Sequence, residues 1–378
     1  MSAENYQNSI LDKVIAASEE NELASFDPVE IVGILFRELP DREQDILRRR
    51  FGLHGKRSET LEQIGKTYNV TRERVRQIEN AAIKHIKGLG HFPEAMKPVD
   101  TVVIHVLEKH GGIMAEDHLL EYVLQIANAE PSHGSHLLFL LNKLSSSQVL
   151  REHKEGFYPV WRIEVIDWDK ADQTIDSLVS IFENHGQPIT KDELLNRFKQ
   201  TDTYRAHRDH FGFDDETMEP IHAHLRVSEQ FKANPFDEWG LAHWNTITPK
   251  RMGDKIYLVM KKHSKPMHFR DIAEQINGAQ FDRKRAYPPT VHNELILDDR
   301  YVLVGRGIYA LKEWGFVPGV VSDVIANILK EKSEPLTRDE IVEAVLEQRL
   351  VKKGTVYLAL SNNSKFGKGG DGKYFLAS

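Results

Sequence analysis

The chain has 378 residues, of which 40% are hydrophobic and 28% charged, and it contains no cysteine. This composition is typical of a globular protein of roughly two to four domains, and it excludes disulfides and thiolate chemistry. No apolar run is long enough to span a bilayer. The first residues, MSAENYQNSILDK, lack the pattern of a signal peptide, so we predict a cytoplasmic protein without a membrane partner.

The net charge of −7 is distributed unevenly along the chain. Residues 28–97 carry 14 basic and 10 acidic side chains, and residues 251–314 carry 12 and 8, so each segment has a net charge of +4. Residues 98–250 carry 14 basic and 25 acidic side chains, a net charge of −11. Because acidic surface repels phosphate, we expect any nucleic acid at the two basic segments, and at most a protein partner at residues 98–250.

Residues 1–27 are predicted to form a short amphipathic helix, over 9–17, followed by an acidic stretch that is either a linker or a disordered tail. Pro28 favours the start of a second helix, over 29–38, because proline suits the first helical turn. A third helix is expected from Asp41 to about Phe51. The last turn of this third helix holds three basic residues, Arg48, Arg49 and Arg50. They either clamp phosphates or simply offset the helix dipole.

Residues 60–87, TLEQIGKTYNVTRERVRQIENAAIKHIK, predict helix, turn and helix. Thr60 is expected to cap the first helix and Thr71 the second, and Asn69 suits a tight turn because it tolerates a left-handed backbone. On the second helix the residues Val75, Ile78 and Ala82 share one face and are expected to pack inward. The opposite face carries Arg72, Glu73, Arg76, Gln77, Asn80 and Lys84.

That outer face has the chemistry of a base reader. Arginine donates two hydrogen bonds to guanine, glutamine makes a two-bond contact with adenine, and glutamate accepts a hydrogen bond from cytosine. The cap at Thr71 places these side chains in the first turns of the helix, where a recognition helix meets base edges. The alternative is an ordinary charged face in contact with solvent.

A family resemblance rests on these residues. LPDREQDILRRRFGL (39–53) followed by TLEQIGKTYNVTRERVRQIENAAIK (60–84) resembles region 4 of the sigma-70 family of bacterial transcription initiation factors, over residues of about 28–90. The resemblance implies a reader of promoter −35 DNA that docks on the flap of the RNA polymerase β subunit. The residues that it implies at bases are Arg72, Glu73, Arg76 and Gln77, with Thr71 and Arg74 at phosphates. The family often has a basic residue where this chain has Ala81, which removes one phosphate contact.

A repeat follows the segment HFPEAMKP (91–98), which we interpret as a domain boundary because of its two prolines. Four segments each predict an apolar-periodic helix, a polar or Gly/Pro turn and a second amphipathic helix. Two copies carry a capping box, Thr190 with Glu193 and Thr337 with Glu340. The four segments are 103–124, 178–198, 256–276 and 324–346.

β-Hairpins are expected after three of these segments, at 150–161, 301–311 and 365–377, because Gly-rich centres lie between apolar and aromatic runs. Three helices and a hairpin make a winged helix, although residues 231–244 lack a clean hairpin turn. The predicted fold is therefore mainly α with small β wings, a helix-turn-helix domain followed by tandem winged-helix units; the alternative is generic mixed α/β packing. The predicted domains are 1–27, 28–97, 98–168, 169–250, 251–318 and 319–378.

The third unit carries a second resemblance. AYPPTVHNELILDDRYVLVGRGIYALKEWG (286–315) resembles the HARE-HTH family, a winged-helix module of some bacterial RNA polymerase δ subunits and of chromatin-associated proteins, over residues of about 250–316. Thr290 is expected to cap its third helix. A possible second DNA contact, or alternatively a solubilising basic loop, comprises Arg283, Lys284, Arg285, His292, Asn293 and Arg306.

An enzyme is the contrasting hypothesis, but the sequence has no Walker loop, HExxH or nucleophile elbow. The pairs His207/His210 and His222/His224 suggest metal only weakly, since structural zinc without cysteine is uncommon. We therefore predict no catalytic residue, no cofactor and no metal. The expected function is a nucleoid-associated transcription factor that binds double-stranded DNA and RNA polymerase. The alternative is a polymerase-independent repressor or architectural protein built from tandem winged helices.

Overall fold

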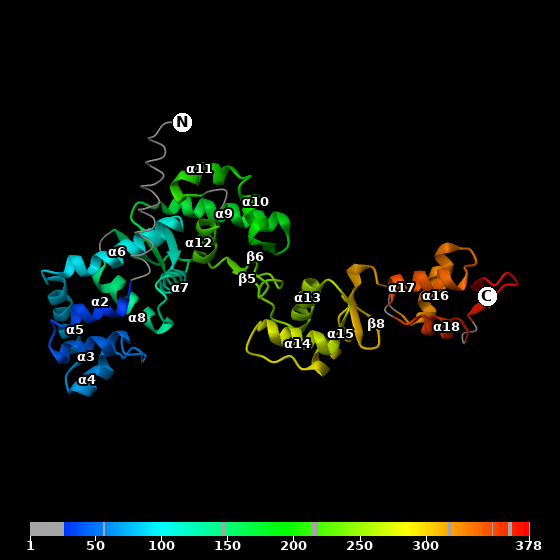
Figure 1. Ribbon diagram of the computed structural model, residues 1–378, viewed down its shortest axis with the longest axis horizontal. Helices are drawn as coiled ribbons and strands as arrows, with labels where there is room; N and C mark the ends of the chain where they lie inside the picture. Colours follow the sequence, from blue (N-terminus) through cyan, green and yellow to red (C-terminus); the bar gives the residue numbers. More distant parts are fainter. Residues whose placement is uncertain are drawn as a thin grey trace. The chain divides into compact units, whose positions relative to one another are not determined.

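The computed structural model describes residues 26–55, 57–145, 148–213, 218–316, 319–349, 351–361 and 365–377. These residues form mostly α-helices with small antiparallel sheets, which confirms the predicted fold class (Figure 1). The helix expected over 9–17 lies outside the described residues. Two compact units are present: unit 1 comprises the described residues up to Gly186 and Lys191–Lys232, and unit 2 comprises Gln187–Thr190 and the described residues from Ala233 onward.

Unit 1 opens with the four helices of the predicted helix-turn-helix domain, which together are called the helix-turn-helix segment (28–87). They are α2 (Pro28–Phe36), α3 (Asp41–Phe51), α4 (Leu61–Tyr68) and α5 (Arg72–Lys87). The Asp27 side chain caps α2 directly before Pro28. Gly52 ends α3 with a φ of 70°, in the left-handed region that glycine enters without strain.

The first repeat has the winged-helix order of helix, strand, two helices and hairpin. Its elements are α6 (Phe92–Lys109), β1 (Ile113–Ala115), α7 (Glu116–Ile126), α8 (Gly134–Phe139), which continues into the π-helical turn η2 (Leu140–Leu144), β2 (Val149–Glu152) and β3 (Val160–Ile163). The sheet order is β1-β3-β2, and all of its pairs are antiparallel. The break expected at 91–98 is absent, because Pro93 lies in the first turn of α6 and the helix continues through Pro98.

The second repeat follows the same order along the chain with one added helix. Its elements are α9 (Trp168–His185), β4 (Ile189–Thr190), α10 (Lys191–Phe198), α11 (Asp202–Phe211), α12 (Glu219–Val227), β5 (Phe231–Ala233) and β6 (Glu238–Leu241). The turn that the sequence did not reveal runs from Asn234 to Asp237. The Asn234 side chain accepts hydrogen bonds from the backbone N–H groups of Phe236 and Glu238, and Asp237 has a φ of 60°.

Unit 2 contains the third and fourth repeats. The third comprises α13 (Met252–His263), β7 (Met267–His268), α14 (Phe269–Ala279), α15 (Pro288–Leu297), β8 (Tyr301–Gly305) and β9 (Ile308–Leu311). The fourth comprises α16 (Val321–Lys332), α17 (Arg338–Gln348), α18 (Lys353–Ser361), β10 (Phe366–Lys368) and β11 (Tyr374–Leu376). The three hairpins predicted by sequence are confirmed. The capping box of Thr337 and Glu340 is also confirmed.

The cap predicted at Thr290 is wrong. Helix α15 begins at Pro288, with Tyr287 in the N-cap position. Two successive prolines have φ values already set for a helical turn and lack the N–H groups that would stay unpaired there, so they start the helix earlier than the threonine. Thr290 therefore lies inside the first turn.

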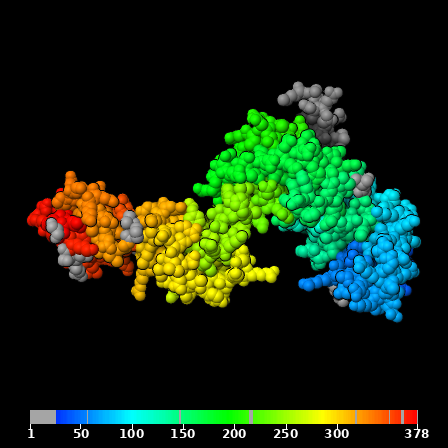
Figure 2. Space-filling view, turned by 180° about the vertical axis from the view of Figure 1, so that it is seen from behind, coloured from blue at the N-terminus to red at the C-terminus, as the bar shows by residue number. Residues whose placement is uncertain are grey.

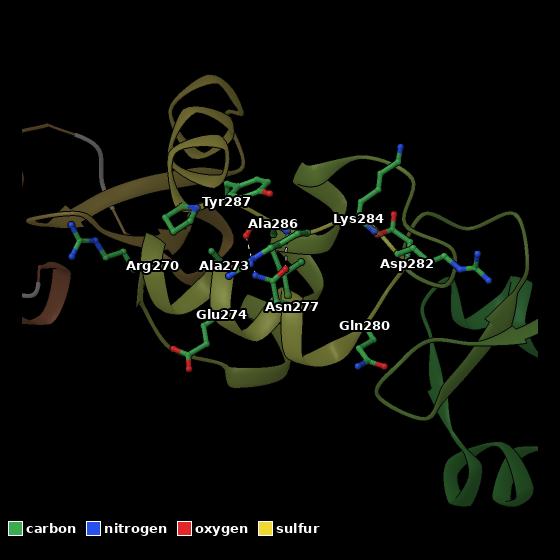
Figure 3. A pocket seen from close by; sticks show the side chains of 13 residues that line it. Arg270, Ala273, Glu274, Asn277, Gln280, Asp282, Lys284, Ala286 and Tyr287 are labelled. Carbon is green, nitrogen blue, oxygen red and sulfur yellow. Dashed lines mark hydrogen bonds between the residues drawn. The ribbon is translucent and has the colours of Figure 1, made fainter.

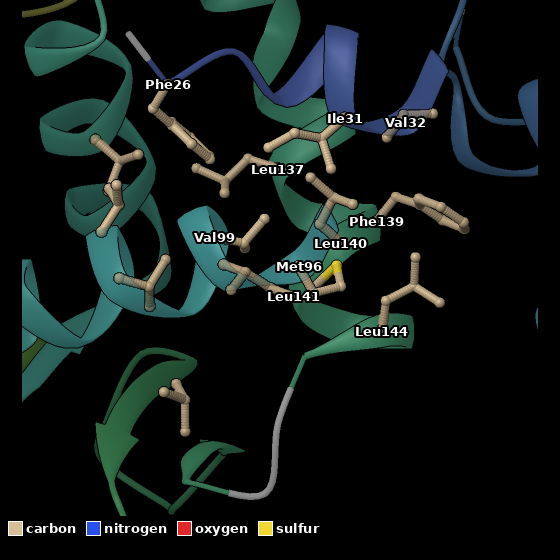
Figure 4. Packing of buried hydrophobic residues seen from close by; sticks show 14 of the residues in the cluster. Phe26, Ile31, Val32, Met96, Val99, Leu137, Phe139, Leu140, Leu141 and Leu144 are labelled. Atoms are coloured by element: carbon tan, nitrogen blue, oxygen red, sulfur yellow. The ribbon is translucent and has the colours of Figure 1, made fainter. Parts of the chain in front are cut away.

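The core of unit 1 joins the helix-turn-helix segment to the first repeat. One cluster of buried apolar side chains runs from α2, α3 and α5 through α6 and α7 to α8 and β3. Figure 4 shows the part of this cluster between α2, α6 and α8. Phe139 of α8 lies edge-on to Phe36 of α2, with ring centroids 5.6 Å apart, and 4.9 Å from the ring of Phe51 at the end of α3. In the space-filling view the blue surface of residues 28–90 continues without a break into the first repeat (Figure 2).

Candidate nucleic-acid interface

Three local features define the start and the end of α4 and the start of α5. Thr60 and Gln63 form a capping box at the start of α4. Asn69 ends α4 in the left-handed region with a φ of 53°. The Thr71 hydroxyl accepts the backbone N–H of Arg74 and so starts α5. The caps at Thr60 and Thr71 and the left-handed Asn69 were expected from the sequence, because each depends only on neighbouring residues, whereas the part of Gln63 in the capping box was not.

Helix α5 has one buried and one exposed side. Val75, Ala82 and Ile86 are fully buried, and Ile78 is partly buried. The eight side chains that sequence analysis selected all lie on the exposed side: Thr71, Arg72, Glu73, Arg74, Arg76, Gln77, Asn80 and Lys84. The structure therefore brings the complete predicted set together on one accessible helix face, with four cations and one acid among them.

The polar groups on this face pair with one another. The Arg76 guanidinium donates to both carboxylate oxygens of Glu73, at 3.0 and 2.7 Å, and Arg74 donates to the Gln77 side-chain oxygen at 3.2 Å. The hydrogen bond from Arg76 lowers the pKa of Glu73, so this carboxylate is ionised and able to accept from a base. An exposed pair of this kind contributes little stability, so a base edge can replace it at small cost.

The three arginines at the end of α3 have partners inside the fold. Arg49 pairs with Asp45 at 2.7 Å and Glu59 at 3.3 Å, and the Arg48 guanidinium lies 5.4 Å from the Phe36 ring. Arg50 lies 3.4 Å from a Glu79 oxygen. These contacts favour a structural role at the helix end over a phosphate clamp.

Glu79 is a residue of α5 that sequence analysis did not single out. It is only 6% exposed, and its carboxylate lies between Arg50 of α3 and Lys143 of η2, at 3.4 and 3.5 Å. A buried carboxylate requires such partners. Glu79 therefore fixes the buried side of α5 to the first repeat. The only signal for it in the sequence was its place among the inward positions of that helix.

Gly65 sets the approach of the two helices. A Cβ atom at this position would lie 2.7 Å from the Val70 backbone oxygen. Glycine within a helix usually costs stability relative to alanine, so its presence in the middle of α4 is explained by this close approach.

We expect Gly65→Ala to lower the free energy of unfolding of unit 1 by about 1–3 kcal/mol, because backbone must move to admit the methyl group. Gly33 of α2 is the matched control, since nothing lies within 4 Å of a Cβ there. Gly33→Ala is expected to stabilise by about 0.5–1 kcal/mol. Chemical denaturation of both variants measures the two changes, and equal signs for them would contradict the packing argument.

The second predicted set is distributed over a loop, a hairpin turn and one helix of unit 2. Arg283, Lys284 and Arg285 are exposed in the loop between α14 and α15, and Arg306 is exposed in the turn between β8 and β9. Asn293 lies on the exposed side of α15. The His292 ring is only partly exposed, because it lies 4.6 Å from the Phe269 ring and 5.9 Å from the Tyr309 ring.

Among the described residues, no group of three His, Asp or Glu side chains is arranged to hold a metal ion. His207 is buried, and its ring nitrogen Nδ1 lies 3.2 Å from the Thr174 hydroxyl. His224 is fully buried, with Nδ1 2.7 Å from the Pro220 backbone oxygen. No described helix is long and apolar enough to cross a bilayer.

A capped pair of helices with an exposed polar second helix defines a helix-turn-helix module of the DNA-binding type. Comparison with known proteins gives the particular class: residues 35–88 match the model of Sigma-70, region 4. The chain is 51% identical over 61 residues to the RNA polymerase sigma factor SigA of Lactococcus lactis subsp. cremoris, and equally to that of Lactococcus lactis subsp. lactis.

The matched stretch covers 16% of this chain, and 16% and 15% of the two relatives. The chain therefore spans about a sixth of the length of the curated relatives that it matches, and the likeness concerns the helix-turn-helix segment alone. The match confirms the resemblance to region 4, which is a DNA-binding and not a catalytic domain. The resemblance of residues 250–316 to HARE-HTH stays a prediction.

Proposed function

We propose that this protein is a transcription factor that reads promoter −35-like DNA with the exposed face of α5 and associates with RNA polymerase to modulate initiation. The observation that carries the proposal is the capped, exposed reading face of α5, in a segment that matches Sigma-70, region 4. In this proposal Arg72, Glu73, Arg76 and Gln77 meet base edges. Thr71, Arg74, Asn80 and Lys84 contact the backbone.

The charge of this face suits the task. The N-terminal end of α5 carries the positive end of the helix dipole, and three arginines lie in its first two turns. Phosphate contacts fix the register of a helix in the groove, and base contacts select the sequence. The arrangement on α5 provides both kinds of group from a single helix.

The polymerase part of the proposal depends on the relatives. They are named RNA polymerase sigma factors, and the resemblance implies docking on the β flap. For the acidic residues 98–250 we propose a protein partner, because their charge opposes DNA. Retention of the full chain on core RNA polymerase supports the proposal. Binding to dispersed genomic sites without polymerase would instead favour a repressor or architectural protein.

We expect Arg76→Ala to weaken binding to a −35 duplex by about 5- to 150-fold and to relax the choice of sequence, as the loss of a two-pronged base contact does. Arg205 of α11 is a matched control, because it forms the same kind of exposed pair with Asp202, three residues before it, at 2.6 Å. Arg205→Ala is expected to leave binding unchanged. Fluorescence anisotropy with cognate and scrambled duplexes measures both variants. If Arg76→Ala weakens both duplexes equally, Arg76 contacts only phosphate.

A further inference from the structure

The loop between α14 and α15 in unit 2 is built to a fixed shape. Asn277 donates to the Ala286 backbone oxygen at 2.9 Å and accepts its N–H at 2.7 Å (Figure 3). At the other end, Asp282 pairs with the buried ammonium of Lys255 at 2.7 Å and accepts the backbone N–H of Lys284. The intervening residues are therefore held outward by the fold and are not a loose basic tail.

This loop borders a hollow of about 550 Å³. Three successive cations of the loop line it, Arg283, Lys284 and Arg285, and all three side chains are exposed. The loop ends at Tyr287, which is 59% exposed and also lines the hollow. The Arg285 guanidinium lies 5.8 Å from the centre of its ring. Two acids, Glu274 and Asp282, also line the hollow. Asp282 is neutralised by its ion pair with Lys255, and Glu274 extends to the opposite side from Lys284 in Figure 3.

Helix α15, which follows the loop, is poorly suited to reading duplex DNA. Its exposed positions include Ile296 and Leu297, which are 62% and 80% exposed, and Thr290 and Asn293 are uncharged. A recognition helix needs donors, acceptors and cations along the side that enters the groove. Three successive cations lie instead in the loop, beside an exposed aromatic ring.

We propose that this hollow binds single-stranded nucleic acid, with an unpaired base stacked on Tyr287 and the flanking phosphates held by Arg283, Lys284 and Arg285. Aromatic platforms beside a cationic groove bind unpaired strands without demanding a sequence, because every base has a face that can stack. A duplex hides those faces, so the site distinguishes unpaired from paired strands. The site does not depend on α5, and it adds a second activity to the proposed reading of duplex DNA.

The test uses the full chain with the α5 reader silenced by Arg72→Ala and Arg76→Ala. Fluorescence anisotropy with short oligo-dT, oligo-U and a duplex of equal length is expected to show tighter binding of single strands than of duplex. Whichever single strand binds more tightly identifies the natural strand as DNA or RNA. Because the reader is silenced throughout, failure of the duplex-reading proposal does not affect this result.

Tyr287→Ala should weaken single-strand binding about 5- to 150-fold, the effect of losing one base–aromatic stack, whereas Tyr287→Phe should keep it. Tyr158→Ala is the control, since Tyr158 is a 37% exposed tyrosine of unit 1. Arg283→Gln with Arg285→Gln should reduce the slope of log affinity against log salt by about 1.4. Lys330→Gln with Lys332→Gln should not. Unchanged affinity in Tyr287→Ala, with an unchanged melting temperature, or duplex binding as tight as single-strand binding, would overturn the proposal.

Discussion

Replacing Phe139 by alanine is expected to lower the free energy of unfolding of unit 1 by about 3–5 kcal/mol. Phe139 is among the largest fully buried side chains of the described chain, and its ring contacts those of Phe36 and Phe51. The destabilisation should extend beyond the first repeat, because Phe36 and Phe51 belong to the helix-turn-helix segment. Hydrogen exchange read by mass spectrometry should show faster exchange in α2 and α3 as well as in α8.

Two variants keep this prediction testable. Leu358→Ala, at a 63% exposed position of unit 2, should change stability by less than about 0.5 kcal/mol. Phe139→Leu keeps an apolar side chain and should show the same pattern of faster exchange with a smaller loss, if the alanine variant does not fold. Faster exchange in α8 with no change in α2 and α3 would show that the two segments do not share a core.

The shared core also limits what the first repeat does. In a winged helix the third helix normally enters the groove, but here α8 and η2 are buried against α2, α3 and α5. Lys143 of η2 is engaged with Glu79. The third helix of this repeat therefore supports α5 from its buried side.

Sequence reasoning succeeded wherever a feature depended on close neighbours along the chain. The caps at Thr60 and Thr71, the left-handed Asn69 and the buried stripe containing Val75 and Ala82 follow from residue type and spacing. For the same reason the eight residues of the reading face were found together. Their contacts with DNA stay a prediction.

The misses have a common physical cause, which is that they depend on distant partners. The segment LLFLLNKL (137–144) is apolar on nearly every side, so its periodicity does not say which surface it covers. Pro98 lies inside α6 because tertiary packing of that helix outweighs the lost backbone hydrogen bond. Glu79 is an acid whose burial follows only from Arg50 and Lys143, which lie far away in sequence. Tyr287 could not be identified as a candidate binding residue from the sequence, because its position depends on the loop that Asn277 fixes through Ala286.

Lowering the pH from 7 to 5 is expected to destabilise unit 1 by several kcal/mol. Burial lowers the pKa of His118 to about 3, with nearby Arg226 and His222 adding to the effect, and lowers the pKa values of His222 and His224 to about 4. The other charged or titratable groups that line the same hollow as His118 and His222 are His110, Glu121, Tyr122, Lys191, Glu219 and Arg226. The ordinary pKa of histidine is 6.5. Below that pH the unfolded chain therefore binds protons that these histidines do not bind in the folded chain.

Stability is therefore complete above pH 6.5 and is lost as the pH falls towards 4, by about 2 kcal/mol for each such histidine at pH 5. Carboxylates whose pKa values are lowered in the fold, such as Glu152, begin to destabilise the protein only when the pH falls below their ordinary pKa of 4.5. The change in the free energy of unfolding between pH 7 and pH 5 therefore comes from the histidines. Chemical denaturation at the two pH values, followed by hydrogen exchange of unit 1 peptides, measures the loss. His118→Gln should reduce it by about 2 kcal/mol, because glutamine takes up no proton. The same loss in this variant as in the parent chain would mean that His118 is already protonated, or open to solvent, in the folded state.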